Sequence, residues 1–146
     1  MNIVIRTNID EFLISLENAL KPTTNPDQLM REVATSLLGV TKNRIHEEGK
    51  AANGEQIGEY SDGYLKLRQR KYNRSSSKKT ILSLTTQMEN DYKVIATDKG
   101  YGIGYDNPFN RQKADWNEQT YKKKIFALTE EEKEQARQIA IDFIQR

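Results

Sequence analysis

The residue types in this chain leave few routes to catalysis. His46 is the only histidine, and the chain has no cysteine. His46 is therefore the only imidazole that could act as a base for a hydroxyl nucleophile, so a hydrolytic triad is disfavoured. His46-Glu47-Glu48 is similar to part of a zinc-binding helix, but Lys50 stands where the second histidine of that motif belongs. We therefore expect no metal here and interpret His46 as a surface residue near a helix end.

Two other groups could carry chemistry. Glu89, Asp91 and Lys93 pair acids with a lysine near a strand, as in a metal-dependent nuclease, but no second acidic cluster completes a two-metal site. Gly100-Tyr101-Gly102-Ile103-Gly104 is rich in glycine, but the sequence predicts no helix behind it to hold a phosphate. We expect solvated charges in the first group and close backbone packing in the second. No catalytic residue, cofactor or metal is predicted.

Positive charge is concentrated in one segment. Residues 66–79 carry seven basic and no acidic side chains, whereas residues 1–65 have a net charge of −4 and residues 80–146 a net charge of −1. Tyrosines lie among and beside these charges, so the segment could bind phosphates and stack on bases. It could equally meet an acidic neighbouring subunit. The candidate interaction residues are Tyr60, Tyr64, Arg68, Arg70, Lys71, Tyr72, Arg74, Lys78 and Lys79.

Length and composition limit the kind of fold that can hold these residues. A chain of 146 residues suits a single domain spanning 1–146. Its apolar share of 36% is low, which favours long polar loops or apolar surface completed by another subunit. No apolar run is long enough to span a bilayer, and no signal peptide is apparent at the start, so no membrane partner is expected. The absence of cysteine is compatible with a cytosolic origin.

Hydrophobic periodicity predicts the elements that must position the candidate residues. Helices are expected over residues 9–20, 26–49 and 130–144, the last opened by a capping box of Thr129 and Glu132. Strands are expected over residues 3–5, 80–88, 91–97 and 101–105. Residues 50–79 have no stable period and predict a long, mobile extended loop, in which Tyr60-Ser61-Asp62 could begin a short helix. Residues 108–124 are expected to be irregular. This order predicts an α+β fold, with helices on a small, mainly antiparallel sheet.

Short motifs in the middle and later part of the chain make the prediction of function more specific. They are Arg44-Ile45-His46-Glu47-Glu48-Gly49, Asn53-Gly54, Tyr60-Ser61-Asp62-Gly63-Tyr64, the segment from Lys79 to Met88, and Ile125-Phe126-Ala127-Leu128-Thr129-Glu130. Over about residues 26–146 this series resembles the phage virion morphogenesis proteins, which are tail-completion and head–tail joining proteins of tailed bacteriophages and prophages. Two departures stand out. Thr85-Thr86-Gln87 lacks the glycine of that family's Thr-x-Gly, and Tyr105–Asn110 replaces a stretch of His-Gln-x-Gly type.

The resemblance implies a structural role without catalysis. It implies a ring-forming subunit, by analogy a hexamer, that is assembled in the cytoplasm of a host bacterium and resides in the virion. Its partners would be copies of itself and other head–tail connector or tail proteins. The segment 50–79 would then reach a neighbour, the tail tube or DNA. The alternative is a nucleic-acid-binding accessory protein that uses residues 66–79, and a small phage nuclease is a third hypothesis.

Overall fold

The fold is α+β, as the sequence predicts. The computed structural model describes residues 8–20, 26–75, 77–83, 86–98 and 100–145, so the strand expected over residues 3–5 lies outside the described residues. In this part of the chain, helices pack on one two-stranded antiparallel sheet. The elements in order are α1 (Asn8–Leu20), α2 (Pro26–Asn43), the π-helical turn η1 (Arg44–Glu48), α3 (Asp62–Tyr72), α4 (Gln87–Asp91), β1 (Tyr92–Thr97), β2 (Gly100–Tyr105), α5 (Pro108–Tyr121) and α6 (Glu130–Ile144).

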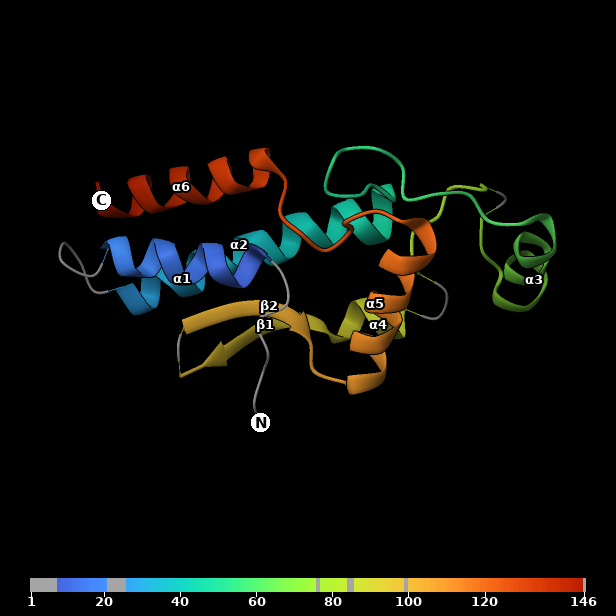
Figure 1. Ribbon diagram of the computed structural model, residues 1–146, viewed down its shortest axis with the longest axis horizontal. Helices are drawn as coiled ribbons and strands as arrows, with labels where there is room; N and C mark the ends of the chain where they lie inside the picture. The colour runs from blue at the N-terminus through green and yellow to red at the C-terminus, as the bar shows by residue number, and fades with distance from the viewer. Residues whose placement is uncertain (1–7, 21–25, 76, 84–85, 99, 146) are drawn as a thin grey trace.

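Helix α2 lies at the centre of the body of the molecule. Helices α1 and α6 and both strands contact it, while α3 lies alone at the far end of the molecule (Figure 1). The buried face of α2 carries its apolar residues at the 3.6-residue period that the sequence shows. Helix α6 begins with the predicted capping box, because the Thr129 hydroxyl and the Glu132 carboxylate each accept a hydrogen bond from the other's backbone N–H.

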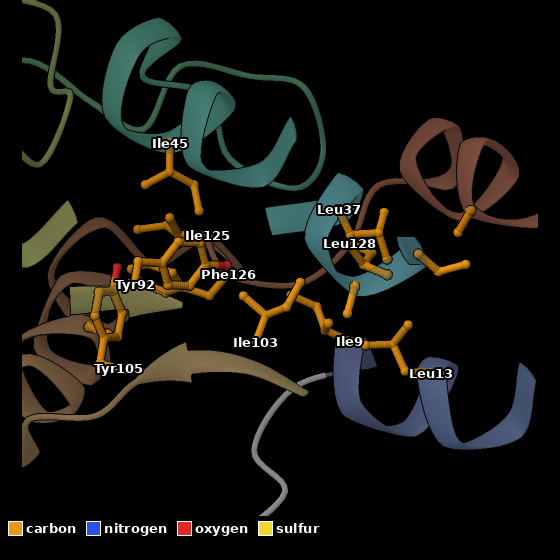
Figure 2. Close-up of a cluster of buried hydrophobic side chains, with 14 of the residues drawn as sticks. Ile9, Leu13, Leu37, Ile45, Tyr92, Ile103, Tyr105, Ile125, Phe126 and Leu128 are labelled. Atoms are coloured by element: carbon orange, nitrogen blue, oxygen red, sulfur yellow. The ribbon is translucent and has the colours of Figure 1, made fainter. Parts of the chain in front are cut away.

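The core is one cluster that joins these elements (Figure 2). Near α1 it is aliphatic, with Ile103 of β2 reaching the residues of α1 and α2. Toward η1 it is aromatic: the ring centroid of Tyr105 lies 4.9 Å from that of Tyr92 and 5.8 Å from that of Phe126. Complete burial raises the pKa of Tyr92 to about 12. Labelled core members are Ile9, Leu13, Leu37, Ile45, Tyr92, Ile103, Tyr105, Ile125, Phe126 and Leu128.

The strands predicted over residues 91–97 and 101–105 are confirmed, and they form a hairpin. Strands β1 and β2 pair antiparallel, with Tyr92 opposite Tyr105 and Thr97 opposite Gly100. The glycines of β2 allow close packing, as expected: a Cβ at Gly102 would collide with the carboxylate of Asp10. That carboxylate accepts a hydrogen bond of 3.3 Å from the Ile103 backbone N–H, so α1 lies directly against the strand.

Two predicted segments are wrong. The strand expected over residues 80–88 does not form, because Leu82 and Thr86 have positive φ angles of 51° and 67° and residues 87–91 are the helix α4. Residues 84 and 85 lie outside the described part. The segment 108–124, expected to be irregular, contains α5. Asn107 caps this helix by accepting a hydrogen bond of 2.9 Å from the Phe109 N–H, and Pro108 occupies its first turn.

Candidate functional site

Residues 58–83 leave the body as two neighbouring limbs, and α3 lies at their tip (Figure 1). We call residues 58–83 the arm. Its limbs are held together by backbone hydrogen bonds from the Tyr60 N–H to the Lys78 carbonyl, at 2.7 Å, and from the Thr80 N–H to the Gly58 carbonyl, at 2.9 Å. The long extended loop that the sequence predicts over residues 50–79 is therefore a paired stalk that carries a helix.

The tip helix forms from local signals. The Ser61 hydroxyl accepts a hydrogen bond from the Tyr64 N–H at 3.3 Å, and Asn73 ends the helix with a left-handed φ of 51°. This agrees with the short helix predicted to begin at residues 60–62. Of the residues in α3, only Arg68 is buried. Because an isolated helix of 11 residues is marginal in water, contacts from outside the helix must help to hold it.

Arg68 supplies that contact. Its side chain is 3% exposed, and its Nη2 donates a hydrogen bond of 2.6 Å to the Ser83 carbonyl on the returning limb. The guanidinium lies 4.3 Å from the Tyr60 ring centroid, a cation–π contact. Arg74 adds a hydrogen bond of 2.9 Å to the Ser83 hydroxyl. Among the candidate interaction residues, Arg68 is thus a structural residue that fixes α3 to the stalk.

Other candidate residues of the arm also make contacts within the chain. Tyr60 is buried, and its hydroxyl accepts a hydrogen bond of 3.1 Å from the Ile81 N–H. Burial raises the pKa of Tyr60. Lys78 lies 2.7 Å from Asp62, and this contact raises the pKa of the lysine. Lys71 lies 5.5 Å from the ring centroid of Tyr72, its neighbour in sequence.

The exposed part of α3 is basic with a small apolar centre. Arg70 and Lys71 are exposed, and so are Tyr64 and Leu67. Tyr64 meets Tyr60 edge to face, with 5.2 Å between ring centroids. Tyrosine and arginine are both enriched in protein–protein interfaces.

A groove of about 410 Å³ separates α3 from the body. Five of its lining residues are tyrosine, leucine or methionine, and the other six are polar or charged. Among the polar ones, the Ser83 hydroxyl donates a hydrogen bond to the Glu89 carboxylate. On the body side, α5 also carries two exposed aromatic residues, Phe109 and Trp116, which are 72% and 56% exposed. The groove is lined by Tyr60, Tyr64, Arg68, Leu82, Ser83, Gln87, Met88, Glu89, Lys113, Asn117 and Tyr121.

The chain is locked in place just before the arm by the motif from Arg44 to Gly49. Gly49 ends η1 with a φ of 67°, and a Cβ there would collide with the carbonyl oxygen of Thr80. Arg44 is 6% exposed and forms a buried ion pair with Glu132, with 3.1 Å between Nε and Oε2. Its guanidinium also donates to the carbonyls of residues 50, 125 and 127, at 2.8 to 3.0 Å. The sequence marked this motif but did not show that its arginine is internal.

The expectation that His46 is a surface residue is wrong. His46 is 1% exposed, and its Nδ1 lies 3.2 Å from the Leu82 carbonyl on the returning limb of the arm. Because a carbonyl only accepts, Nδ1 carries the proton and Nε2 faces the Tyr105 hydroxyl at 3.4 Å. Burial lowers the pKa of His46. The limb that covers His46 comes from 36 residues further along the chain, a contact that helix periodicity cannot show.

The acidic residues weighed as a nuclease site have structural partners. Asp91 accepts hydrogen bonds from the Asn107 N–H at 2.8 Å and from Asn110 Nδ2 at 2.9 Å, which ties α4 to the start of α5. Burial alone would raise the pKa of Asp91, but these hydrogen bonds outweigh it and lower the pKa. Glu89 accepts a hydrogen bond from the Ser83 hydroxyl. Within the described residues, no group of three or more potential ligands is placed to hold a metal ion.

Among the helices in the described ranges, none has the length and apolar character required to cross a bilayer. Comparisons with protein-family models, with curated proteins and with solved structures find no match to this chain.

Proposed function

We propose that this chain is a structural, non-enzymatic subunit of a phage or prophage virion, and that it acts in tail completion or head–tail joining. The virion setting rests on the sequence resemblance. The assembly role rests on one observation: α3, with Arg68 as its only buried residue, is held away from the body by a hydrogen-bonded stalk.

The energetics of the arm support an assembly role. A helix in which no apolar residue is fully buried contributes little to the hydrophobic core of its own fold. The chain nevertheless orders it through a capped start, a buried arginine and a paired stalk. Ordering a surface before it binds reduces the entropy lost on association. A pre-ordered arm is therefore suited to binding a partner, and its exposed tyrosine and arginine side chains favour a protein as that partner.

Nucleic-acid binding is the second candidate, favoured by the seven basic residues of segment 66–79. The geometry gives it weaker support. Tyr60 is buried with Arg68 against its ring, and Lys71 lies near the ring of Tyr72, so each of these two rings already has a cation of this chain on one face. Lys78 is paired with Asp62. Bases that stack on aromatic rings need those faces open.

Sedimentation velocity over a wide concentration range tests the proposal. We expect the wild-type chain to self-associate and the double variant Arg70→Glu/Lys71→Glu to do so much less, because both residues are exposed on α3. The matched control is Lys93→Glu/Lys124→Glu, which makes the same charge change at exposed positions of the body. Mass spectrometry of purified virions from the encoding phage or prophage should also find the chain.

DNA binding is the outcome that would contradict the proposed assembly role. Tight DNA binding by a monomer at physiological salt, with affinity falling steeply as salt rises, would reject the assembly role in favour of phosphate contact. Absence of the chain from purified particles would reject the virion setting.

A further inference from the structure

The two ends of the molecule carry opposite charge. Helices α1 and α6 lie side by side, with the Arg137 guanidinium 5.4 Å from the Phe12 ring centroid, and the arm projects at the opposite end (Figure 1). Helix α1 has three acidic and no basic residues, and α6 has five acidic and two basic residues. Residues 62–83 have seven basic and one acidic. When the buried Arg68 and Glu132 are left out of these counts, the arm is still basic and the two helices are still acidic.

Each charged end also exposes a pair of apolar side chains. Tyr64 and Leu67 are 37% and 43% exposed on α3, and Ile141 and Ile144 are 44% and 45% exposed on α6. Residues three apart on a helix lie on the same side of it, so each pair forms one small patch. Within the described residues, these four are among only six large apolar side chains that are exposed.

We infer that α3 of one copy docks on the α1–α6 face of a second copy, with Tyr64 and Leu67 against Ile141 and Ile144. Arg70 and Lys71 then face carboxylates of α1 and α6 such as Glu11 and Glu134, both of which are exposed. Glu134 also forms an ion pair of 3.1 Å with Arg137 on its own helix. Opposite charges around an apolar centre favour encounter in one orientation. This inference rests on the proposed function and names the partner of its arm.

The geometry of this contact is head-to-tail, because the two surfaces are different and lie at opposite ends (Figure 1). Such a contact uses the arm of one copy and the α1–α6 face of the next, so the first copy keeps its α1–α6 face free and the second keeps its arm free. It generates a closed ring where the rotation between copies closes and a filament where it does not. A two-fold dimer, in which one patch meets its own copy, is a different arrangement.

Site-directed cross-linking tests the contact, and the absence of cysteine from the chain makes introduced thiols specific. Gly63→Cys places a thiol one turn from Leu67, in open space and without changing charge. Gln138→Cys places a thiol beside Ile141, and the control Gln112→Cys places one on α5 between Phe109 and Trp116; both positions are exposed. Pairs of these otherwise intact variants are mixed and treated with a bifunctional maleimide.

We expect a mixed dimer from Gly63→Cys with Gln138→Cys, and much less product from Gly63→Cys with Gln112→Cys. Arg70→Glu/Lys71→Glu in the Gly63→Cys chain should remove most of the product. Raising salt from about 0.05 M to about 1 M should do the same, since the Debye length then falls to about 3 Å. Equal product from both mixtures, or cross-linking mainly between two Gly63→Cys chains, would overturn the head-to-tail contact. If the chain self-associates in sedimentation but gives one of these contrary cross-linking results, the head-to-tail contact is rejected and the proposed function is not.

Discussion

At the scale of single residues, Arg44 shows how a charge can be buried in this fold. It pairs with Glu132 on α6 and donates to carbonyls before the arm and before α6. The desolvation of an ion pair is offset only where the remaining donors are also satisfied, and here several are. Arg44 thus fixes the end of η1 to the start of α6, and the arm begins from a rigid base.

Gly49 occupies a position where the fold cannot accept a side chain. Gly49→Ala should lower the free energy of unfolding by at least about 2 kcal/mol, because a left-handed residue with a Cβ is strained and this Cβ would also strike the Thr80 carbonyl. Gly39→Ala is the matched control. It lies within α2 in open space and should stabilise the chain by about 0.5–1 kcal/mol. Urea denaturation measures the free energy of unfolding of both variants, and equal effects of the two substitutions would contradict this account.

His46 predicts how stability depends on pH. Burial lowers its folded-state pKa below the value of about 6.5 in an unfolded chain, so the unfolded chain binds more protons below about pH 6.5. The free energy of unfolding should therefore fall as pH drops from about 6.5 toward the folded pKa, by up to about 1.4 kcal/mol per pH unit. Above about pH 6.5 the contribution of His46 is constant.

His46→Asn provides the comparison, because asparagine does not titrate in this range. Urea denaturation of both chains between about pH 5 and pH 8 yields the difference attributable to the imidazole. Carboxyl groups such as Asp10, whose pKa is raised by burial, contribute to both chains and cancel in that difference. Parallel pH profiles for the two chains would show that His46 is not held neutral by the fold.

At the scale of elements, the arm should be a unit of local stability separate from the body. Arg68→Lys removes the planar group that stacks on Tyr60 and donates to Ser83, and lysine cannot replace both contacts. Amide hydrogen exchange in peptides covering residues 62–72 should become markedly faster, while peptides from α2 stay protected. Arg70→Lys on the exposed side of α3 is the control. Unchanged exchange in α3 would show that Arg68 does not hold the arm.

The elements that the sequence predicts best are those whose signals are local. The capping box of Thr129 and Glu132 and the strand over residues 101–105 each need only neighbouring residues. The α+β order followed from these elements. Helix α5 also had local signals, since Asn107 and Pro108 are a cap and a first-turn proline, but its polar composition hid the helical period.

The features that the sequence could not show depend on distant contacts. The buried state of His46 requires the Leu82 carbonyl, and that of Arg68 requires Ser83 on the other limb. A basic residue within a charged run gives no sign that it is internal, because its partner is a backbone carbonyl rather than an acidic side chain. The sequence therefore pointed to the segment that forms the arm, but it did not separate the arginine that holds the arm from those that are exposed.

At the scale of the whole molecule, the body and the arm differ in what stabilises them. Among the described residues, the buried apolar cluster comes from residues 9–57 and 92–140, and none of its fully buried members lies between residues 58 and 91. Leu82 and Met88 only pack against its edge. The body therefore has its own core, while the arm is held by hydrogen bonds, cation–π contacts and a short stalk.

This division predicts that the tip of the arm can be removed without unfolding the body. Replacing residues 61–77 with a short glycine–serine link keeps the hydrogen bonds that pair the base of the stalk, and shortening a loop adds little entropic cost. Loss of the Arg68 contacts should lower the melting temperature by only about 2–4 °C, the effect of about 1 kcal/mol in a chain of this size. Leu37→Ala in the core should cost more, about 2–5 kcal/mol.

The same variant should lose self-association, because in the proposed head-to-tail assembly the arm supplies one surface of every junction. Calorimetry and sedimentation velocity on one preparation separate the two effects: a cooperative transition shows that the body is folded, and a single monomer boundary shows that the contact is gone. A chain that no longer unfolds cooperatively would mean that the arm is part of the core of the fold. A folded chain that still associates would place the subunit contact elsewhere on the body, with the exposed aromatic residues of α5 as the next surface to test.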